Sequence, residues 1–390
     1  MRLSYKYRIC LNKAQEKEFT KTLNFCRTLY NSALQERRSH YESFTKKFPN
    51  HKKDGIKYVG PTKTTQCEHL KEIKIEFEEQ VEKIYSQCLQ DVINRLDRTY
   101  ISFFSRCKKG DKPGYPRFKN KDRYNSVTFT QCDFDRFGIR LLEDNKHINI
   151  YGLGKVKIEY HRPFEGKCKL VTLLKKGNKY YVCLSCDNIP KNPLPKTCKD
   201  VGIDLGILNF ATCDDGKVFS HPKPYKTAKE KLAYHQRKLA LKKKGSNNRK
   251  KQKMILANCH EHIANIRKDF LHKFSNTIVK SYDDITMEDL NIKSMIESDN
   301  KKVNKGNIQD MGWGMGLDFI SYKAERADKV FKKKDPTGTS KECSCCRNYN
   351  NDLTLADRVY ECKICGLKID RDLNAAKNIK RLGMSLAILK

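Results

Sequence analysis

The hydrophobic and polar positions of the chain change their period several times along its length. Residues 5–9, Tyr-Lys-Tyr-Arg-Ile, alternate between ring or aliphatic side chains and charged ones, which is typical of an amphipathic strand. Apolar residues then recur at helical spacing over residues 19–34 and 77–103, and a polar stretch with two prolines and two glycines joins these runs. The pattern predicts a strand followed by a helical unit at residues 15–106.

Short alternating runs replace the helical pattern after Lys108, where glycines and prolines at positions 110–116 end the helix. Four such runs lie within residues 127–184 and predict a β-rich unit, for which a small barrel is the expected architecture. If the strand at residues 3–10 joins this barrel, the helical unit is an insertion in it. Three prolines within residues 190–195 predict a boundary between the two halves of the chain.

Positive charge is concentrated early in the second half. A strand is predicted at residues 201–205 and a long helix over residues 255–278, and residues 223–253 between them carry thirteen Lys or Arg against one acid, Glu230. A solvated helical hairpin is one interpretation. A run this one-sided more often lies along phosphates, so we expect it to contact nucleic acid. Its densest parts are Lys242, Lys243 and Lys244, followed by Arg249, Lys250 and Lys251.

The whole chain is also strongly basic. Its 390 residues contain 80 Lys+Arg against 46 Asp+Glu, a formal net charge of +34 that a polyanion such as nucleic acid would neutralise. No uninterrupted apolar run approaches the length of a membrane span, and no charged-then-apolar leader opens the sequence. We therefore expect no membrane partner and no secretion.

Seventeen cysteines are scattered through the chain, which favours a reducing compartment over a disulfide framework. Most of them, such as Cys26 and Cys88, fall at apolar positions of the predicted helices and are expected to be buried free thiols. Cys183 and Cys186 lie in a predicted strand with no second pair nearby, so we expect them to serve packing as well.

One cysteine set has the spacing of a metal site. Cys343 and Cys346 form a C-x2-C pair, and after fifteen residues Cys362 and Cys365 form a second pair. Two such pairs can close a tetrahedral four-thiolate site for Zn2+, and a site with no open position is structural. Cys345 lies inside the first pair and could exchange with either neighbour, although its spacing is poorer.

Three acidic residues stand at the ends of apolar segments. In residues 201–206, Val-Gly-Ile-Asp-Leu-Gly, the apolar side chains alternate on one face, which leaves Asp204 on the other face between two glycines. Glu288 takes the same position in a second predicted strand. Asp372 could begin a helix whose small residues permit close packing against a sheet.

Together these carboxylates could bind Mg2+, which prefers oxygen ligands and is held by a few carboxylates, water and phosphate oxygens. Two such ions can activate water and stabilise the leaving oxygen in phosphodiester hydrolysis. Consecutive acids are 84 residues apart, so spacing alone does not bring them together. Each acid by itself could equally cap a helix or join an ion pair.

Several longer motifs are spread over nearly the whole chain. They are Y-K-Y-R-I at 5–9, S-Q-C-L-Q-D-V at 86–92, G-Y-P-R-F-K at 114–119, V-G-I-D-L-G at 201–206, M-E-D-L-N-I at 287–292, Y-K-A-E at 322–325, the two cysteine pairs, and D-R-D-L-N-A-A-K-N-I at 370–379. In combination they resemble the TnpB (OrfB) family of insertion sequences, a relative of type V CRISPR effectors and of Fanzor. The family's first acid falls on Asp204, its glutamate on Glu288 and its last acid on Asp372. One departure is Arg347, where a glycine usually follows the first cysteine pair, together with the additional Cys345.

The resemblance implies a multi-domain α+β protein that cleaves DNA under the guidance of RNA and is encoded by a transposable element. It implies two Mg2+ ions on the three acids, one structural Zn2+ on the four cysteines, and a guide RNA derived from the element. The target is double-stranded DNA with a short flanking motif, and we expect a protein monomer on the RNA. The implied domains are a β-barrel wedge domain at 1–14 and 107–192, a helical recognition lobe at 15–106, a RuvC-like nuclease domain of the RNase H fold at 196–336 and 367–390, and a C4 zinc module at 337–366.

The guide RNA would supply sequence specificity, while basic surfaces hold the heteroduplex by its backbone. Candidate backbone contacts are Arg117 and Lys119 and the six Lys and Arg residues of the charge run named above. Ser86, Gln87 and Gln90 lie on a predicted helix of the recognition lobe, where amide side chains could read adenine edges of the flanking motif. A merely polar helix face is the alternative for these three.

Other functions remain open at this point. The chain could be an RNA-bound DNA-binding regulator with weak or no cleavage, although all three acids are present. It could be a transposase that joins strands itself, but no separate nucleophile motif is visible. A Fanzor-type eukaryotic or viral homologue would act in the nucleus, whereas a bacterial protein would act in the cytoplasm, associated with the nucleoid.

Overall fold

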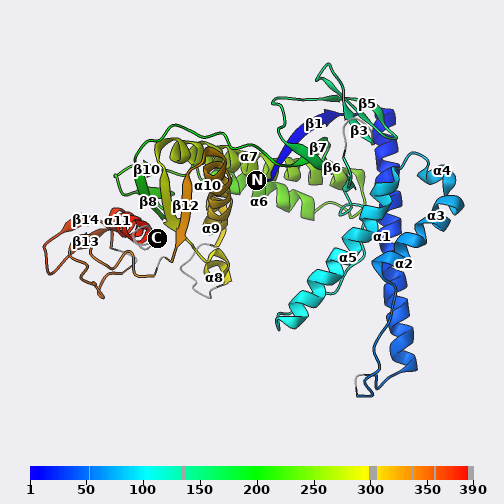
Figure 1. The fold of residues 1–390 in the computed structure, drawn as a ribbon, viewed down its shortest axis with the longest axis horizontal. Coiled ribbons are helices and arrows are strands. Elements are labelled where there is room, and N and C mark those ends of the chain that lie inside the picture. The colour runs from blue at the N-terminus through cyan, green and yellow to red at the C-terminus, as the bar shows by residue number, and fades with distance from the viewer. Residues whose placement is uncertain (52, 133–137, 298–304, 336, 355–356, 385–390) are drawn as a thin grey trace. The chain divides into compact units, whose positions relative to one another are not determined.

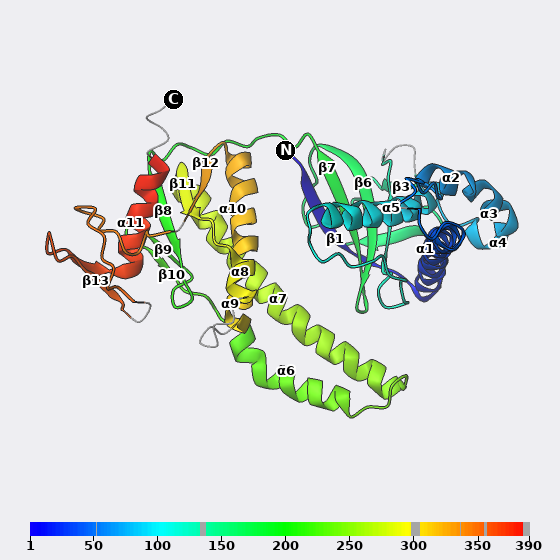
Figure 2. The same cartoon turned by 90° about the horizontal axis from the view of Figure 1, so that it is seen from below.

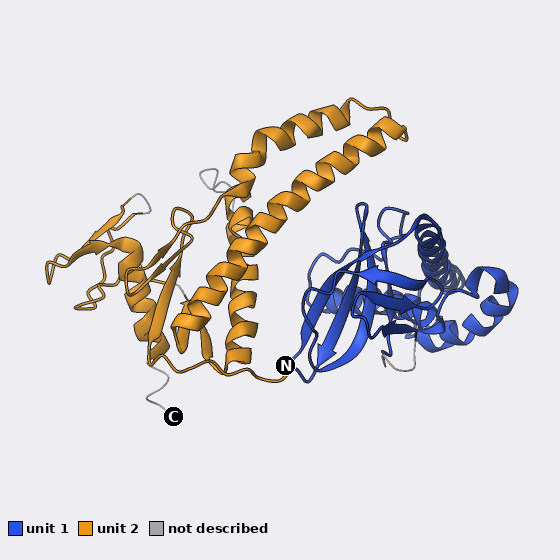
Figure 3. Ribbon diagram, turned by 90° about the horizontal axis from the view of Figure 1, so that it is seen from above, with its two compact units in different colours: residues 1–189 blue, residues 190–390 orange. Residues whose placement is uncertain are grey.

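The protein consists of two compact units, residues 1–189 and 190–390, with the chain passing from one to the other at the proline-rich segment (Figure 3). The structure is a computed structural model. It describes all residues except 52, 133–137, 298–304, 336, 355–356 and 385–390. Each unit has a sheet and a core of its own.

The first unit contains a seven-stranded antiparallel sheet with the order β2-β6-β7-β1-β5-β4-β3 (Figures 1 and 2). β1 alternates as its sequence predicts, because Tyr5, Tyr7 and Ile9 are buried and Lys6 and Arg8 are exposed. The strands are β1 (Leu3–Cys10), β2 (Ser126–Phe129), β3 (Ile139–Leu141), β4 (His147–Ile150), β5 (Gly154–Ile158), β6 (Lys167–Lys176) and β7 (Lys179–Asp187).

The β-rich unit predicted here is present as a seven-stranded sheet, while closure of this sheet into a barrel stays a prediction. The strand order places β2 and β3 at the two edges, and no backbone ladder joins these edges in the part of the chain that the structure describes. Hydrophobic alternation specifies which face of a strand is buried, but it carries no information about which strands pair at the edges. The position of β1 between β7 and β5 makes the helices that follow it an insertion within this sheet.

Five helices fill that insertion, and the two longest pack their apolar stripes against each other. α1 begins with a capping box in which Asn12 and Gln15 exchange side-chain to backbone hydrogen bonds of 2.9 and 3.0 Å. Cys26 and Cys88 are buried in the core between the helices, as small apolar side chains would be. The helices are α1 (Lys13–Lys47), α2 (Lys63–Glu68), α3 (Leu70–Glu76), α4 (Glu78–Val81) and α5 (Ser86–Lys108).

The second unit is built on a five-stranded mixed sheet with the order β10-β9-β8-β11-β12. β8, β11 and β12 run parallel, whereas β9 is antiparallel to both of its neighbours. The strands are β8 (Asp200–Leu205), β9 (Ala211–Cys213), β10 (Val218–Phe219), β11 (Asp284–Glu288) and β12 (Val330–Lys334).

Helices cover both faces of this sheet, with α11 on one face and α10 and the end of α7 on the other (Figures 1 and 2). Val201, Ile203 and Ile285 are fully buried in a core shared with α7 and α10. Residues 202 and 204 therefore point to the α11 face, because side chains alternate along a strand. The helices are α6 (Pro224–Ala240), α7 (Asn247–Ser281), α8 (Ile292–Glu297), α9 (Lys305–Met311), α10 (Trp313–Ala327) and α11 (Arg371–Met384).

Two glycine contacts set the close approach of α11 to the sheet. A Cβ on Gly202 of β8 would overlap the backbone oxygen of Ala376 and the backbone nitrogen of Lys380. On the helix side, a Cβ on Gly383 would overlap the side chain of Thr286 in β11. The helix axis is thus held nearer the sheet than larger residues would permit.

We expect the Gly202→Ala substitution to destabilise the second unit by about 1–3 kcal/mol, because the added methyl meets backbone that can yield only if α11 shifts. Thermal unfolding monitored by circular dichroism would measure the loss. Gly314→Ala in α10 is the matched control, since its Cβ would make only an ordinary contact with Ile292 at 3.6 Å. Equal stability of the two variants would contradict this account of the packing.

Although α1 and α7 each have 35 residues, no helix in the described ranges is long and apolar enough to cross a membrane.

Candidate functional site

Asp204 and Glu288 lie side by side at the carboxyl ends of two neighbouring parallel strands. In the β8–β11 ladder Ile203 is paired with Met287, so the next residues of the two strands are Asp204 and Glu288. Both acids point to the α11 face, because the residues before them point into the core on the other face. Glu288 is only 5% exposed, and Asp204 is partly buried.

Asp372 reaches the same place from the first turn of α11. The helix begins at Arg371, and its N-terminal cap is Asp370, whose Oδ1 accepts hydrogen bonds from the N–H groups of Asp372 and Leu373 at 2.9 and 3.0 Å. The sequence suggested that Asp372 starts the helix, and the structure shows that Asp370, two residues earlier, caps it. Because Asp370 caps the helix, the Asp372 carboxylate is available to the site. Its Oδ2 lies close to Gly206, which follows β8, at 3.9 Å from the position that a Cβ on Gly206 would take.

The three carboxylates influence one another electrostatically. Burial raises the pKa of Asp204 well above its usual range, and the charges of Glu288 and Asp372 raise it further. Burial likewise raises the pKa of Glu288. Hydrogen bonds with Asp204 and Thr339 oppose this rise. Arg371 lies beside the group, with a nitrogen 3.4 Å from Asp372 Oδ1, and favours the charged form of Asp204. Like charges crowded in a desolvated space are stabilised by a bound cation.

The four predicted zinc ligands also come together. Cys343 Sγ is 3.6 Å from Cys365 Sγ, and Cys346 Sγ is 3.5 Å from Cys362 Sγ. With Zn–S bonds of about 2.3 Å, sulfur atoms at the corners of a tetrahedron lie about 3.8 Å apart. The cluster therefore fits a zinc ion with little movement. Within the described ranges it is the only group of three or more potential ligands whose atoms all lie within 4.8 Å, so the three carboxylates are gathered less tightly.

The two cysteine pairs have matching backbone geometry. The N–H of Arg347 donates to the carbonyl of Cys343, and the N–H of Gly366 donates to the carbonyl of Cys362, both at 3.0 Å. Arg347 and Gly366 both have positive φ, 67° and 72°. Arg347 thus takes the left-handed position that glycine usually fills, and the knuckle keeps its shape at the cost of about 1–2 kcal/mol of backbone strain.

Cys345, the alternative ligand, is exposed and is not a member of the cluster. The structure therefore supports the Cys343 and Cys346 register for the first pair. A short hairpin, β13 (Val359–Glu361) and β14 (Lys368–Asp370), connects the second pair to α11.

The three residues predicted to read bases, Ser86, Gln87 and Gln90, differ in whether their side chains are already hydrogen bonded within the protein. Gln87 and Gln131 exchange two hydrogen bonds of 2.8 Å, between their amide groups and from the Gln131 N–H to Gln87 Oε1. Ser86 Oγ accepts a hydrogen bond from Lys74 Nζ at 2.7 Å. Gln90 is exposed. Reading a base with Ser86 or Gln87 would require these internal contacts to break, which leaves Gln90 as the better placed of the three.

The turn that contains Arg117 and Lys119 is anchored on α1. Asn31 binds the backbone of Lys119 with two hydrogen bonds of 2.8 and 3.0 Å, and Lys119 Nζ lies 5.6 Å from the centre of the Tyr30 ring. Arg117 is exposed. The anchored turn thus presents Arg117 to solvent, where it could contact a phosphate.

The predicted charge run forms the α6–α7 hairpin (Figure 2). Arg249 is used within it, because its guanidinium donates to the carbonyls of Leu239 and Lys242 at 2.5 and 2.8 Å and closes the turn. The other predicted contacts are exposed on the turn and the start of α7. They are Lys242, Lys243, Lys244, Lys250 and Lys251. A cavity of about 410 Å³ lies between the two helices and is lined by Lys231, His235, Asn258 and His262 among others.

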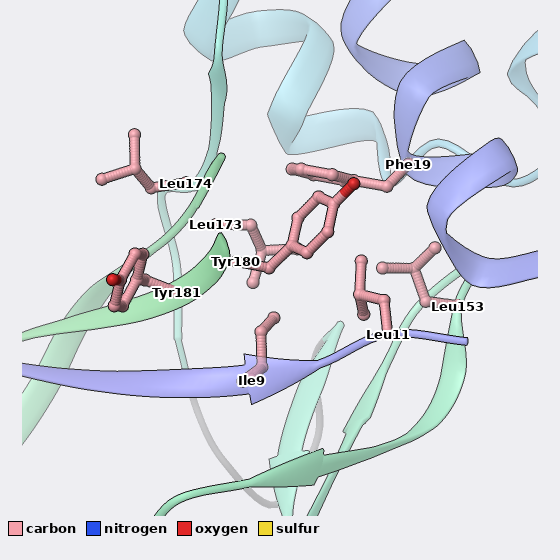
Figure 4. Close-up of a pocket in the computed structure, with 8 residues that line it drawn as sticks. All are labelled: Ile9, Leu11, Phe19, Leu153, Leu173, Leu174, Tyr180 and Tyr181. Atoms are coloured by element: carbon pink, nitrogen blue, oxygen red, sulfur yellow. The ribbon is translucent and has the colours of Figure 1, made fainter. Parts of the chain in front are cut away.

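A second hollow lies in the first unit, where β1, β6 and β7 meet α1 (Figure 4). Its lining is entirely apolar or aromatic, and it has no room for a water molecule. Phe19 and Tyr180 meet edge to face across it with ring centres 5.9 Å apart. The hollow is part of the packed core, and apart from the hydroxyls of Tyr180 and Tyr181 its lining side chains are apolar.

Three buried polar residues near the acids were missed in the sequence. Thr339 Oγ1 donates to Glu288 Oε1 at 3.3 Å, and Asn374 and Asn378 of α11 bind backbone carbonyls of the segment leading into the cysteine cluster. The two asparagines lie within the D-R-D-L-N-A-A-K-N-I motif, where their spacing of four is a signal for one helix face. Thr339 carries no local signal, because its partner is 51 residues away.

Three protein-family models match parts of the chain. Residues 181–299 match the OrfB family of IS605 elements, described as a probable transposase. Residues 313–379 match a Cas12f1-like TNB domain. Residues 1–47 match a helix-turn-helix domain of the OrfB group, although the structure has β1 and a single helix there.

The chain is also similar to individual proteins over nearly its whole length. It is 28% identical over 392 residues to the putative RNA-guided DNA endonuclease InsQ of Escherichia coli (strain K12), which covers 97% of this chain and 92% of InsQ. It is 28% identical over 391 residues to a putative RNA-guided DNA endonuclease of Streptomyces pristinaespiralis, covering 98% of this chain and 89% of that protein. A cryo-EM structure of a Cas12f1-sgRNA-target DNA complex aligns with 97% of this chain and 99% of that chain, at 16% identity and a TM-score of 0.36.

Proposed function

We propose that the chain is an RNA-guided DNA endonuclease of the TnpB (OrfB) family, whose OrfB model matches residues 181–299. The observation that carries the proposal is the convergence of Asp204, Glu288 and Asp372 on one face of the second sheet. Acids at the ends of adjacent parallel strands, with a third on the helix that covers them, support a RuvC-like nuclease domain in this unit. The convergence also disfavours a regulator that has lost cleavage.

The three carboxylates would hold Mg2+, and their chemistry fits that ion. They offer oxygen ligands from two strands and a helix, and burial together with the neighbouring carboxylates raises the pKa values of Asp204 and Glu288, which a bound cation would lower. The chemistry that bound Mg2+ supplies is activation of the attacking water and stabilisation of the leaving oxygen. The protein holds the acids in place and keeps Arg371 beside them. The four-cysteine cluster would hold one structural Zn2+.

Guide RNA and target DNA are the proposed partners, and the charge of the chain supports them. A net charge of +34 favours binding to a polyanion, and the exposed lysines of the α6–α7 hairpin are suited to phosphates. We propose that base pairing with the guide supplies most of the specificity and that the protein reads a short flanking motif, with Gln90 as a candidate reader.

Copurification of the protein with RNA transcribed from its own element, followed by cleavage of a plasmid library with randomised flanks in Mg2+, tests the proposal. We expect a defined noncoding RNA to copurify and cleavage to occur beside one flanking motif only. Cleavage that is independent of the RNA would contradict guidance. RNA-dependent DNA binding without cleavage would instead identify a regulator.

A further inference from the structure

Thr339 joins the segment that leads into the cysteine cluster to the glutamate of the acidic site. Thr339 lies four residues before the first cysteine of the cluster and is only 3% exposed. Its hydroxyl donates a hydrogen bond to Glu288 Oε1 at 3.3 Å. Glu288 also hydrogen bonds with Asp204 and with the backbone of Leu205, so several neighbours fix the position of this carboxylate.

Helix α11 fixes the backbone that carries Thr339. Asn378 Nδ2 donates to the carbonyl of Thr339 at 2.9 Å and to the carbonyl of Glu342 at 2.7 Å. Asn374 Nδ2 donates to the same Glu342 carbonyl at 2.8 Å, and its Oδ1 accepts from the N–H of Ser344 at 2.9 Å. Both asparagines have no exposed surface. Buried amides with this many backbone partners hold a segment in one conformation.

The same helix carries Asp372 in its first turn, so these contacts tie three parts of the molecule together. Ser344 lies inside the first cysteine pair, and Arg381 of α11 forms an ion pair with Glu342 at 2.7 Å. The first cysteine knuckle, the helix with the last acid and the strand with the glutamate therefore form one connected network.

We propose that Thr339, held by Asn378, is a positioning residue that orients the Glu288 carboxylate for metal binding. The proposal rests on the proposed function, because it takes Glu288 as a ligand of the divalent ion. Ligating carboxylates are commonly fixed by a hydrogen bond from a neighbouring residue, and losing such a bond costs about 10- to 100-fold in metal affinity. The zinc module thereby acts on the acidic site without touching the ion.

Metal binding by the RNA-loaded protein in the absence of DNA tests this directly. The probe is Mn2+, followed by electron paramagnetic resonance, and the Mg2+ concentration for half-maximal cleavage is a second measurement. We expect Thr339→Val, which keeps the shape and removes the donor, to weaken Mn2+ binding by about 10- to 100-fold. We expect Thr339→Ser, which restores the hydroxyl, to bind Mn2+ nearly as the unmodified chain does.

Thr337→Val is the matched control. Thr337 lies two residues earlier, is exposed, and its hydroxyl donates to Asp335 at 2.6 Å rather than to the site. Unchanged Mn2+ binding in Thr339→Val, or an equal loss in Thr339→Ser, overturns the positioning role while the proposed function stands. If Asp204→Asn fails to reduce Mn2+ binding, the metal site itself is wrong, and both proposals fall. Zinc content measured on each variant separates a local effect from loss of the module.

Discussion

Replacing Asp204 with asparagine is expected to reduce DNA cleavage by about 10³-fold or more while the protein still folds and binds its RNA. Asparagine keeps the size of the side chain and removes the charge that would hold Mg2+ beside Glu288. Metal assistance contributes several kcal/mol to such reactions, and about 4 kcal/mol corresponds to a factor of 10³. Single-turnover cleavage of a plasmid bearing the matched target measures the loss.

Asp200→Asn is the control, because Asp200 lies at the opposite end of the same strand. It should cleave at nearly the unmodified rate. The Asp204 variant should also unfold at a temperature no lower than the unmodified chain, since the substitution relieves repulsion among buried carboxylates. Cleavage by the Asp204 variant within a factor of ten of the unmodified rate would remove Asp204 from the site.

Loss of the zinc cluster is the second large effect that we expect. Cys362 is 2% exposed, and its thiol lies 3.5 Å from that of Cys346. Because structural zinc sites contribute about 10–16 kcal/mol of apparent binding free energy, Cys362→Ser should release the metal and unfold residues 343–365. Zinc content by mass spectrometry and limited proteolysis of this segment measure the two consequences.

Cys345→Ser provides the matched comparison, since Cys345 is exposed and outside the cluster. That variant should keep one zinc per chain and the proteolysis pattern of the unmodified protein. If Cys345→Ser loses zinc and Cys362→Ser retains it, the ligand set drawn from the structure is wrong.

Structural features that follow from a local sequence pattern, such as strand alternation or cysteine spacing, were predictable. Features that depend on pairing between distant segments were not. The alternation around Ile203 and Asp204 placed the acid on the face opposite the core, and the structure has it there. The spacing of the cysteines predicted a cluster because both pairs are local turns. Closure of the first sheet into a barrel depends instead on the relative positions of the edge strands β2 and β3, on which their alternation carries no information.

The sequence also did not reveal which polar side chains already have partners within the protein. Gln87 reads as a free polar residue on a helix, but its amide is paired with Gln131, 44 residues away. Arg249 belongs to a run of cations that suggests phosphate contacts, yet the turn it closes takes its guanidinium. The resemblance to the TnpB (OrfB) family, which the comparisons confirm, specifies motifs and leaves such partners unstated.

The placement of the third acid on α11 has a consequence for how the protein is made. Synthesis proceeds from the N-terminus, and domains fold as they emerge. The two strand acids are complete when Glu288 has been added, but Asp372 follows only 84 residues later. A translation product interrupted between these positions carries two acids and an uncovered sheet face. Under the proposed function, such a fragment lacks both α11 and the third metal ligand, so we expect it to be unable to cleave DNA.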